Sequence, residues 1–143
     1  MATSTAEAVW EGSLKDGKGT MKLGSGAFNG AYSFRTRFEG APGTNPEELI
    51  GAAHAGCFSM ALSAGLGKSG FTPTRIKTNA KVHLEKVGEG FKITRIELTT
   101  EAAIPNITEA QFKEHAEGAK KGCPVSQALA GAQIELDAKL VSA

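Results

Sequence analysis

The chain has 143 residues, enough for a single domain over 1–143 that buries its own hydrophobic core without stabilising disulfides. Its charge is nearly balanced, with 16 Lys and Arg against 15 Asp and Glu, so composition does not point to a nucleic-acid groove or an anionic membrane surface. The first residues carry neither a basic start nor an apolar run. We therefore expect no signal peptide, and a cytoplasmic protein whose two cysteines rest reduced.

The N-terminal third predicts short strands. Residues 6–14 and 19–23 flank an Asp-Gly pair, which predicts a β-hairpin. Residues 32–38 alternate, with aromatic side chains on one face and Arg35 and Arg37 on the other. This alternation predicts a further strand that ends just before a glycine-containing loop.

A long central helix follows. Asn45 is a good N-cap, Pro46 fits the first helical position, and Glu48 lies in the register of a capping box. Leu49–Gly67 contains no Asp, Glu, Lys or Arg and is long enough to cross a bilayer. It is rich in Gly, Ala and Ser and lies between strands, so we interpret it as a buried helix of a soluble fold. Its small residues let another backbone approach closely.

The remaining strands alternate with period two. Residues 76–85 form one strand, and a turn at 88–90 leads into the next, whose change of phase predicts a bulge near Thr94-Arg95. Residues 132–140 alternate cleanly and predict the last strand.

Two more helices are expected between these strands. Thr108 and Gln111 form a capping box that predicts a helix ending near Gly122. Cys123 followed by Pro124 predicts a third, short helix. The order strands, helix, strands, helices, strand predicts an α+β fold with an antiparallel sheet.

The two cysteines are the candidates for chemistry. Cys57 lies more than three turns inside its helix, beyond the reach of the helix dipole, so a reactive thiolate there requires a neighbouring cation. Cys123 lies at a helix N-terminus, which lowers a thiol pKa. The alternatives are that Cys57 is a small buried hydrophobic residue and Cys123 an inert loop residue. As a pair, the two could act as attacking and resolving thiols of a peroxidase cycle.

Four charged residues near the long helix are further candidates. Arg35 and Arg37 are either solvated surface charges or site residues, and Glu47 and Glu48 could simply favour the start of the helix.

A zinc site remains an alternative. The spacing of His54 and Cys57 places them on one helix face, and His115 and Cys123 could complete four ligands. The usual close Cys-x2-Cys pair is absent, however, and we expect neither a metal nor a cofactor.

Three stretches carry a resemblance to a known family. They are residues 36–40, residues 43–62 from the Gly-Thr-Asn-Pro-Glu-Glu motif to Cys57 and beyond, and the Gly-Cys-Pro-Val-Ser run at 122–126. With the opening Val-Trp-Glu-Gly at 9–12, they closely resemble the osmotically inducible protein C family, which is related to the organic hydroperoxide resistance proteins. The likeness extends over nearly the whole chain.

The resemblance implies a thiol peroxidase that reduces organic hydroperoxides to alcohols. It implies Cys57 as the peroxidatic cysteine, Cys123 as the resolving one, Arg37 as the catalytic arginine and Glu47 as the glutamate that orients it. It also implies the OsmC-like fold, in which the sheet packs on the long central helix and an intertwined homodimer carries its active sites at the subunit interface. The reductant would be an external dithiol, such as a lipoylated protein. A non-catalytic redox sensor or a stress-induced binding protein with the same thiols is the alternative.

Helix geometry adds a constraint. Glu47 and Cys57 are ten residues apart on one helix, which corresponds to about 15 Å of rise. A glutamate side chain cannot cover that distance, so we expect Glu47 of one subunit to lie beside Cys57 of the other.

Overall fold

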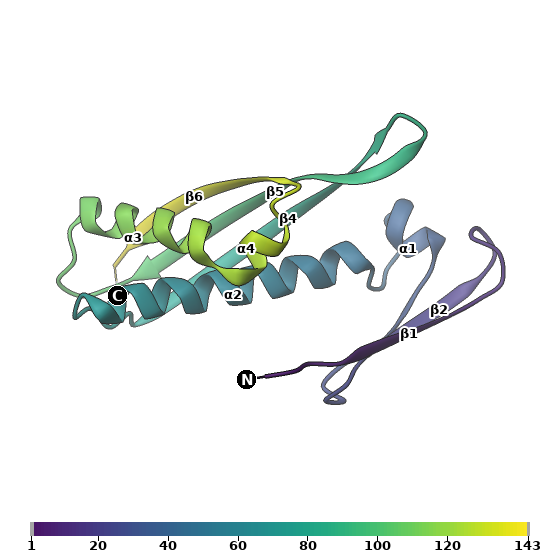
Figure 1. The fold of residues 1–143 in the computed structure, drawn as a ribbon, viewed down its shortest axis with the longest axis horizontal. Coiled ribbons are helices and arrows are strands. Elements are labelled where there is room, and N and C mark those ends of the chain that lie inside the picture. The colour runs from purple at the N-terminus through teal and green to yellow at the C-terminus, as the bar shows by residue number, and fades with distance from the viewer. Residues whose placement is uncertain (1, 143) are drawn as a thin grey trace. The chain divides into compact units, whose positions relative to one another are not determined.

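The computed structural model describes residues 2–142, which divide into two compact units, one ending at Leu49 and one beginning at Ile50 (Figure 1). Each unit is described below by itself. The elements are β1 (Ala6–Glu11), β2 (Lys18–Leu23), β3 (Asn29–Tyr32), α1 (Phe34–Phe38), α2 (Pro46–Lys68), β4 (Arg75–Val87), β5 (Gly90–Ala103), α3 (Glu109–Gly122), α4 (Pro124–Ala128) and β6 (Gln133–Val141).

The first unit is built on an antiparallel sheet in the order β1-β2-β3. The expected hairpin is confirmed, with β1 paired to β2 along their whole length. Trp10 and Tyr32 lie opposite Gly19 on neighbouring strands, and their rings are 5.4 Å apart. A Cβ atom at Gly19 would lie 2.5 Å from the Trp10 ring, so this aromatic pair requires a glycine between its members.

The strand expected over residues 32–38 is wrong beyond Tyr32. Ser33 caps the short helix α1 instead: its hydroxyl accepts from the Thr36 backbone N–H, and the Thr36 hydroxyl accepts from the backbone N–H of Ser33. Phe34 and Phe38, four residues apart, then stack on one helix face with ring centroids 4.9 Å apart. A spacing of four residues places two side chains on one face of either a strand or a helix. The capping box at Ser33 favours the helix.

The start of α2 is as expected, with one difference. The Asn45 side chain accepts a hydrogen bond of 2.8 Å from the Glu48 backbone N–H, and Pro46 opens the helix. The Glu48 carboxylate does not complete the capping box, because it accepts from the Thr44 hydroxyl instead. The helix ends at Lys68, and it is long and apolar enough to cross a membrane by length and composition alone.

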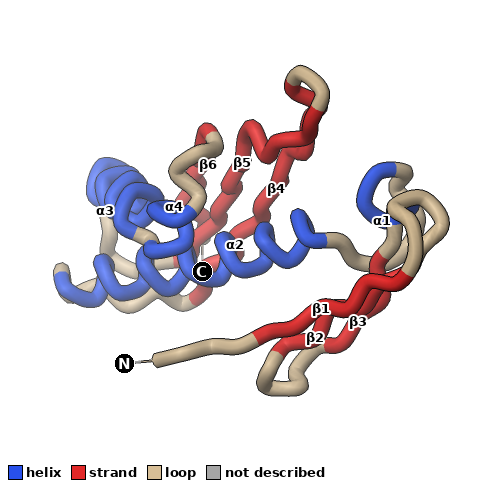
Figure 2. The backbone as a smooth tube through the Cα atoms, turned by 45° about the vertical axis from the view of Figure 1, so that its right-hand side comes forward, coloured by secondary structure: helices blue, strands red, loops and turns tan. Residues whose placement is uncertain are grey.

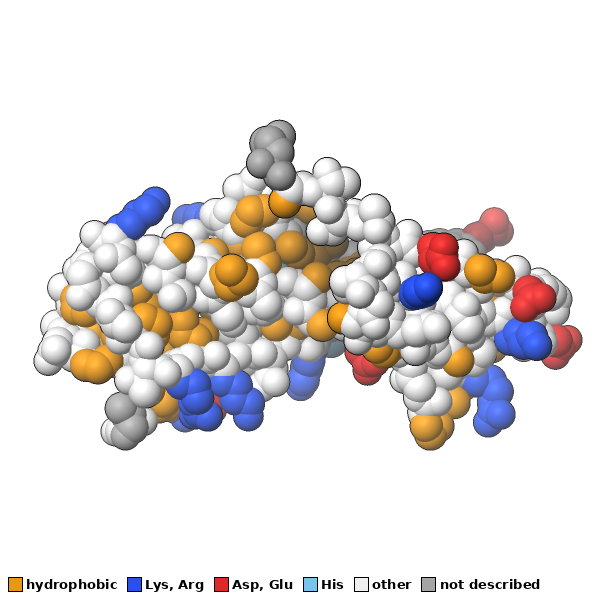
Figure 3. Space-filling view, turned by 90° about the horizontal axis from the view of Figure 1, so that it is seen from below, with side chains coloured by type: hydrophobic (Ala, Val, Ile, Leu, Met, Phe, Trp, Pro, Cys, Tyr) orange, Lys and Arg blue, Asp and Glu red, His pale blue; other side chains and the backbone are white. Residues whose placement is uncertain are grey.

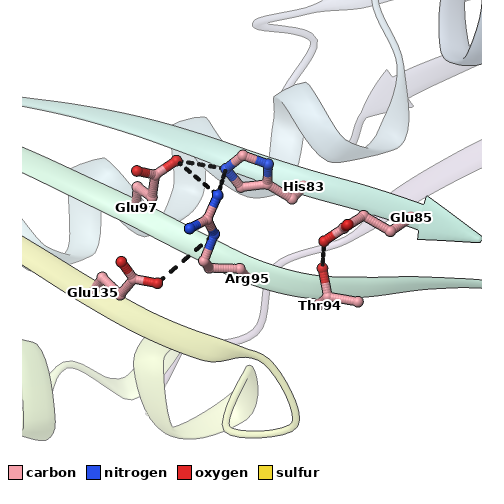
Figure 4. A network of polar contacts seen from close by, with 6 residues as sticks. All are labelled: His83, Glu85, Thr94, Arg95, Glu97 and Glu135. Carbon is pink, nitrogen blue, oxygen red and sulfur yellow. Dashed lines mark hydrogen bonds and ion pairs between the residues drawn. The ribbon is translucent and has the colours of Figure 1, made fainter. Parts of the chain in front are cut away.

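The second unit contains the sheet β4-β5-β6 (Figure 2). Strands β4 and β5 are antiparallel, and the register slips between His83 and Leu84 because Thr94 is the extra residue on β5. The expected bulge is therefore confirmed. Thr94 donates to Glu85 beside it. A separate network joins Arg95 to His83, Glu97 and Glu135 (Figure 4). This network occupies the polar face of the sheet.

The last strand departs from the expected antiparallel sheet. β6 lies parallel to β5, with Ile96 opposite Ile134 and Ala102 opposite Leu140. Two parallel neighbours need a crossover connection, and here the segment that contains α3 and α4 supplies it. Alternation in the sequence identifies a strand but carries no information about its direction. The α+β class itself is confirmed.

The core lies between the other face of this sheet and the helices. Phe58 and Leu62 of α2, Ile96 and Leu98 of β5, and Phe112 of α3 are all completely or almost completely buried. The capping box of α3 is formed as expected, since Thr108 and Gln111 exchange hydrogen bonds. The core thus fixes α2 and the segment that follows α3 on one side of the sheet, and both carry a cysteine.

Candidate functional site: a thiol pair and an arginine–glutamate pair

The structure brings the two cysteines together. Cys57 lies on the fourth turn of α2 and Cys123 lies directly before α4, 66 residues further along the chain. Their Sγ atoms are 2.7 Å apart, and both thiols are free. A disulfide needs about 2.05 Å between sulfurs, so a small side-chain movement is enough to form it.

The short helix α4 explains why Cys123 faces its partner. The Cys123 side chain does not cap the helix, although the residue occupies the N-cap position and Pro124 follows it. Its backbone N–H donates to the Ala119 carbonyl, which closes α3. The residue is therefore fixed through its backbone, and its sulfur remains available to Cys57.

The two thiols differ in acidity. Burial raises the pKa of Cys57, the neighbouring Cys123 raises it further, and a hydrogen bond from the Val125 backbone N–H only partly offsets them. Burial also acts to raise the pKa of Cys123, but the neighbouring Cys57 thiol and the polar groups at the start of α4 outweigh it and lower that pKa. Within this chain the thiolate is favoured on Cys123, and Cys57 needs an additional positive charge to ionise.

The first unit carries the other two expected site residues as an ion pair. Arg37 donates from Nε and Nη2 to the two carboxylate oxygens of Glu47, at 3.0 and 2.9 Å. This two-point geometry fixes the plane of the guanidinium. The Glu47 side chain is 9% exposed and that of Arg37 is 35% exposed, so the carboxylate is buried while the cation still reaches the surface.

Arg35 behaves differently from Arg37. Its side chain is 76% exposed and forms an ion pair with Glu39, the C-cap residue of the same helix, at 3.8 Å. The surface interpretation therefore applies to Arg35. Glu47, in contrast, does more than favour the start of α2, because it holds Arg37.

An aromatic pocket adjoins Arg37 within the first unit. It has a volume of about 210 Å³ and is lined by Trp10, Leu14, Tyr32, Ser33, Phe34, Arg37 and Phe38. The Arg37 guanidinium lies 5.4 Å from the centre of the Phe38 ring, within cation–π range. The pocket thus combines apolar walls with one cation.

Sequence reasoning missed one further pair. His54 is completely buried, and its Nε2 lies 2.7 Å from the Ser126 hydroxyl oxygen. Each member stands three residues from a cysteine, His54 before Cys57 and Ser126 after Cys123. The i, i+3 spacing was visible for His54 but suggested a metal ligand, and nothing in the sequence pairs it with Ser126.

The zinc alternative finds no support among residues 2–142. They contain no group of three or more His, Cys, Asp or Glu side chains able to hold a metal ion. His54 contacts Ser126, and His115 lies edge-on to the Phe71 ring. The four side chains weighed as ligands therefore do not form one site.

Comparisons with known proteins agree with the fold. A family model described as OsmC-like protein matches residues 38–139. The peroxiredoxin OsmC of Escherichia coli (strain K12) is 58% identical over 137 residues, which cover 95% of each chain. An organic hydroperoxide resistance protein of Xanthomonas axonopodis pv. citri (strain 306) is 31% identical over 93 residues, covering 64% of this chain and 63% of that one. The crystal structure of an OsmC-like protein from Mycoplasma pneumoniae has a TM-score of 0.75 at 20% identity and covers 98% of each chain. The expected family and the OsmC-like fold of the single chain are confirmed.

Proposed function

This chain belongs to the OsmC family, and from that premise we propose that it is a thiol peroxidase that reduces organic hydroperoxides to alcohols. The names of its relatives support a peroxidase-like redox role. The observation that carries the proposed two-cysteine mechanism is the distance of 2.7 Å between the sulfurs of two free thiols that are 66 residues apart in the chain. Two free thiols at this distance suit a cycle of oxidation and disulfide formation.

The cycle begins at Cys57. Its thiolate attacks the terminal oxygen of the hydroperoxide, the O–O bond breaks, and the alkoxide takes a proton and leaves as the alcohol. The sulfur becomes a sulfenic acid, and Cys123 condenses with it to a disulfide with loss of water. An external dithiol then reduces the disulfide by exchange, and a lipoylated protein is the reductant that we propose. Rapid condensation protects Cys57 from irreversible oxidation.

Arg37 is the cation that we propose for Cys57. Among the described residues, only the hydrogen bond from the Val125 backbone N–H lowers the Cys57 pKa. Burial raises this pKa by more than the hydrogen bond lowers it. A guanidinium beside the sulfur would favour the thiolate and stabilise the charge that develops on the peroxide oxygens. Glu47 would hold that guanidinium in one orientation through its two hydrogen bonds.

Helix geometry supports a second subunit as the source of this cation. Glu47 and Cys57 both lie on the continuous helix α2, and ten residues correspond to about 15 Å of rise. We propose that the Arg37–Glu47 pair of one subunit serves Cys57 of the other, in a composite site of a homodimer.

The exposed side of α2 suits such a dimer. Met60 is 76% exposed on it, and the neighbouring exposed positions are small residues, including Ala52, Ala53, Gly56 and Ala64. In Figure 3, hydrophobic side chains gather on the face where α2 lies, and the Lys and Arg side chains lie toward its edges.

Gly56→Glu should place a charge in this interface and convert the dimer to monomers, as measured by light scattering. A Gly56→Glu protein that remains dimeric would contradict the α2 interface.

The aromatic pocket supports a proposal for the substrate class. Its apolar walls suit an apolar group, and Arg37 among its lining residues would direct the polar end of a substrate. Hydrogen peroxide has no group to fill such a pocket. We therefore propose a preference for lipid-like or aromatic hydroperoxides.

Steady-state kinetics test the function. We expect kcat/KM to be higher for cumene or tert-butyl hydroperoxide than for hydrogen peroxide, with dihydrolipoamide as the reductant. Oxidation of the thiols without repeated turnover would instead support the alternative of a redox sensor or binding protein.

We further propose a single domain over residues 1–143 and a cytoplasmic location, in which both thiols rest reduced.

A further inference from the structure

His54 is a buried polar residue that the proposed cycle leaves without a role. Its side chain is completely buried, and Nε2 lies 2.7 Å from the hydroxyl oxygen of Ser126, which is itself only 4% exposed. Within residues 2–142, Nδ1 has no hydrogen-bond partner. Burial lowers the His54 pKa, so the ring is neutral near pH 7. The contact with Ser126 is therefore the side-chain hydrogen bond that this ring makes among the described residues.

This hydrogen bond joins the same two segments as the thiol pair. His54 lies on α2 three residues before Cys57, and Ser126 lies on α4 three residues after Cys123. Three residues of helix correspond to about 4.5 Å of rise. The nitrogen–oxygen contact and the sulfur–sulfur contact each measure 2.7 Å. They are thus two neighbouring cross-links between α2 and the start of α4.

Two cross-links constrain the start of α4 more than one would. A single contact between the sulfurs leaves this segment free to turn about the contact. The second contact lies nearly one helical turn away and removes that freedom. It therefore fixes the direction from which the Cys123 sulfur approaches its partner, as well as the distance.

Other hydrogen bonds of this segment stay within the junction between α3 and α4. The Cys123 backbone N–H donates to the Ala119 carbonyl at 3.0 Å, and the Gln127 side chain donates to the Gly122 carbonyl at 3.2 Å. Both bonds fix the shape of the junction, and neither sets its distance from α2. The bond between the imidazole and the hydroxyl does set that distance, at a buried point where water does not compete for either group.

We propose that His54 is a positioning residue, whose hydrogen bond to Ser126 holds the start of α4 on α2 and so keeps Cys123 within reach of Cys57. The role in turnover rests on the proposed peroxidase cycle, in which Cys123 must attack an oxidised Cys57. The positioning itself is a property of the folded chain and can be measured without peroxide.

The step that the hydrogen bond assists is the condensation. The Cys123 sulfur attacks the sulfur of the Cys57 sulfenic acid, the S–S bond forms and the S–O bond breaks. The hydroxide that leaves combines with the proton of the Cys123 thiol to give water. Sulfenic sulfur is reduced and thiol sulfur is oxidised, so no further oxidant is required. A segment that is already held in place loses little freedom when the bond forms, which favours both the rate and the extent of the reaction.

The equilibrium between dithiol and disulfide measures the positioning. Reduced protein is equilibrated with mixtures of reduced and oxidised dithiothreitol, and the disulfide fraction is determined by alkylation and mass spectrometry. His54→Leu and Ser126→Ala should each lower the equilibrium constant for the protein disulfide by about fivefold, the factor that corresponds to one hydrogen bond. The reason is that the freed segment must be ordered again whenever the disulfide forms.

Conservative changes and a double variant test whether the two side chains act as a pair. His54→Gln and Ser126→Thr retain a polar group at each position and should keep the equilibrium constant near that of the unmodified protein. The double variant, His54→Leu with Ser126→Ala, should lose no more than either single variant, because both changes remove the same hydrogen bond. Losses that add in the double variant would contradict the proposal.

Ser59→Ala is the matched control for loss of stability. Ser59 also lies on α2, and its hydroxyl is 2.7 Å from that of Thr78 on β4, so the change removes a hydrogen bond from the same helix to the sheet. Thermal unfolding should detect the lost stability while the disulfide equilibrium stays constant. An unchanged equilibrium constant in both His54→Leu and Ser126→Ala would overturn the proposal, as would an equal decrease in Ser59→Ala. Ser126→Ala removes a single oxygen atom and decides the case if His54→Leu does not fold.

A single-turnover experiment separates this inference from the proposed function. With one equivalent of cumene hydroperoxide, His54→Leu should oxidise Cys57 at the normal rate but form the disulfide about fivefold more slowly. Disulfide formation at the normal rate would refute the inference alone. Failure of the unmodified protein to consume hydroperoxide would refute the peroxidase function, while the dithiothreitol equilibrium would still decide the role of His54.

Discussion

The arginine–glutamate pair of the first unit and the thiol pair of the second are held in different ways. Arg37 and Glu47 are ten residues apart in the chain, and two short hydrogen bonds fix a cation that stays 35% exposed. Cys57 and Cys123 are 66 residues apart, and burial opposes ionisation of both. One unit thus presents a cation held by a carboxylate, and the other presents a thiol whose pKa is raised by burial. The proposed peroxide chemistry at Cys57 combines the two.

Removing either sulfur should have the largest effect. Cys57→Ser should abolish peroxidase activity, because it removes the sulfur that attacks the hydroperoxide in the proposed cycle. Cys123→Ser should permit one oxidation and then stop, with Cys57 passing to sulfinic and sulfonic acids that mass spectrometry detects. Full activity in the Cys57→Ser protein would reject the mechanism.

Removing the cation tests whether the first unit supplies what the second lacks. Arg37→Ala should lower kcat/KM by about 100-fold to 1,000-fold, the usual loss for a group that stabilises developing charge. It should also raise the Cys57 pKa, measured by alkylation. Arg35→Ala, on the same short helix but 76% exposed, is the control and should leave both values unchanged. Equal effects of the two changes would show that Arg37 has no special role.

Weakening the second unit alone should cost stability. Leu62 is completely buried on the helix that carries Cys57, and Leu62→Ala should reduce the free energy of unfolding by about 2–5 kcal/mol. Val87, 52% exposed near the β4–β5 turn, is the control, and Val87→Ala should change it by less than about 0.5 kcal/mol. Denaturant titration measures both, and a cost below 1 kcal/mol for Leu62→Ala would contradict the described core.

The two capping boxes allow a finer comparison of the units. Ser33→Ala and Thr108→Ala each remove an N-cap and should each cost about 1 kcal/mol of stability. Ser33 caps the helix that carries Arg37, so only its loss should also reduce kcat/KM. The comparison between the units fails if Thr108→Ala reduces kcat/KM as much as Ser33→Ala does.

The smallest effect concerns pH. Burial lowers the His54 pKa in the folded chain, so the unfolded chain binds more protons once the pH falls below the ordinary histidine value of about 6.5. Stability from this residue is present above that pH and is lost as the pH falls toward the folded pKa. Urea titrations across this range should show a weaker pH dependence for His54→Gln. Glu97, whose pKa is lowered mainly by a hydrogen bond from His83, acts in a separate window below about 4.5.

Several parts of the fold could be read from the sequence because their signals are local. The starts of α2 and α3, the turn before β5 and the bulge at Thr94 each depend on residues within a few positions of one another. Local signals gave a wrong prediction where the periodicities of a strand and a helix coincide. Phe34 and Phe38 suit a strand face and a helix face equally, and the hydrogen bonds of Ser33 decide between them.

The sequence by itself determined the helix starts, the alternating strands and the cysteines that carry the family resemblance, because these depend on short-range hydrogen bonding and side-chain periodicity. Only the tertiary structure decided that β6 lies parallel to β5, that Cys57 meets Cys123, and that His54 meets Ser126. These contacts join segments far apart in the chain. Packing of α2, α3 and the sheet around one core selects them, and no short stretch of sequence encodes that choice.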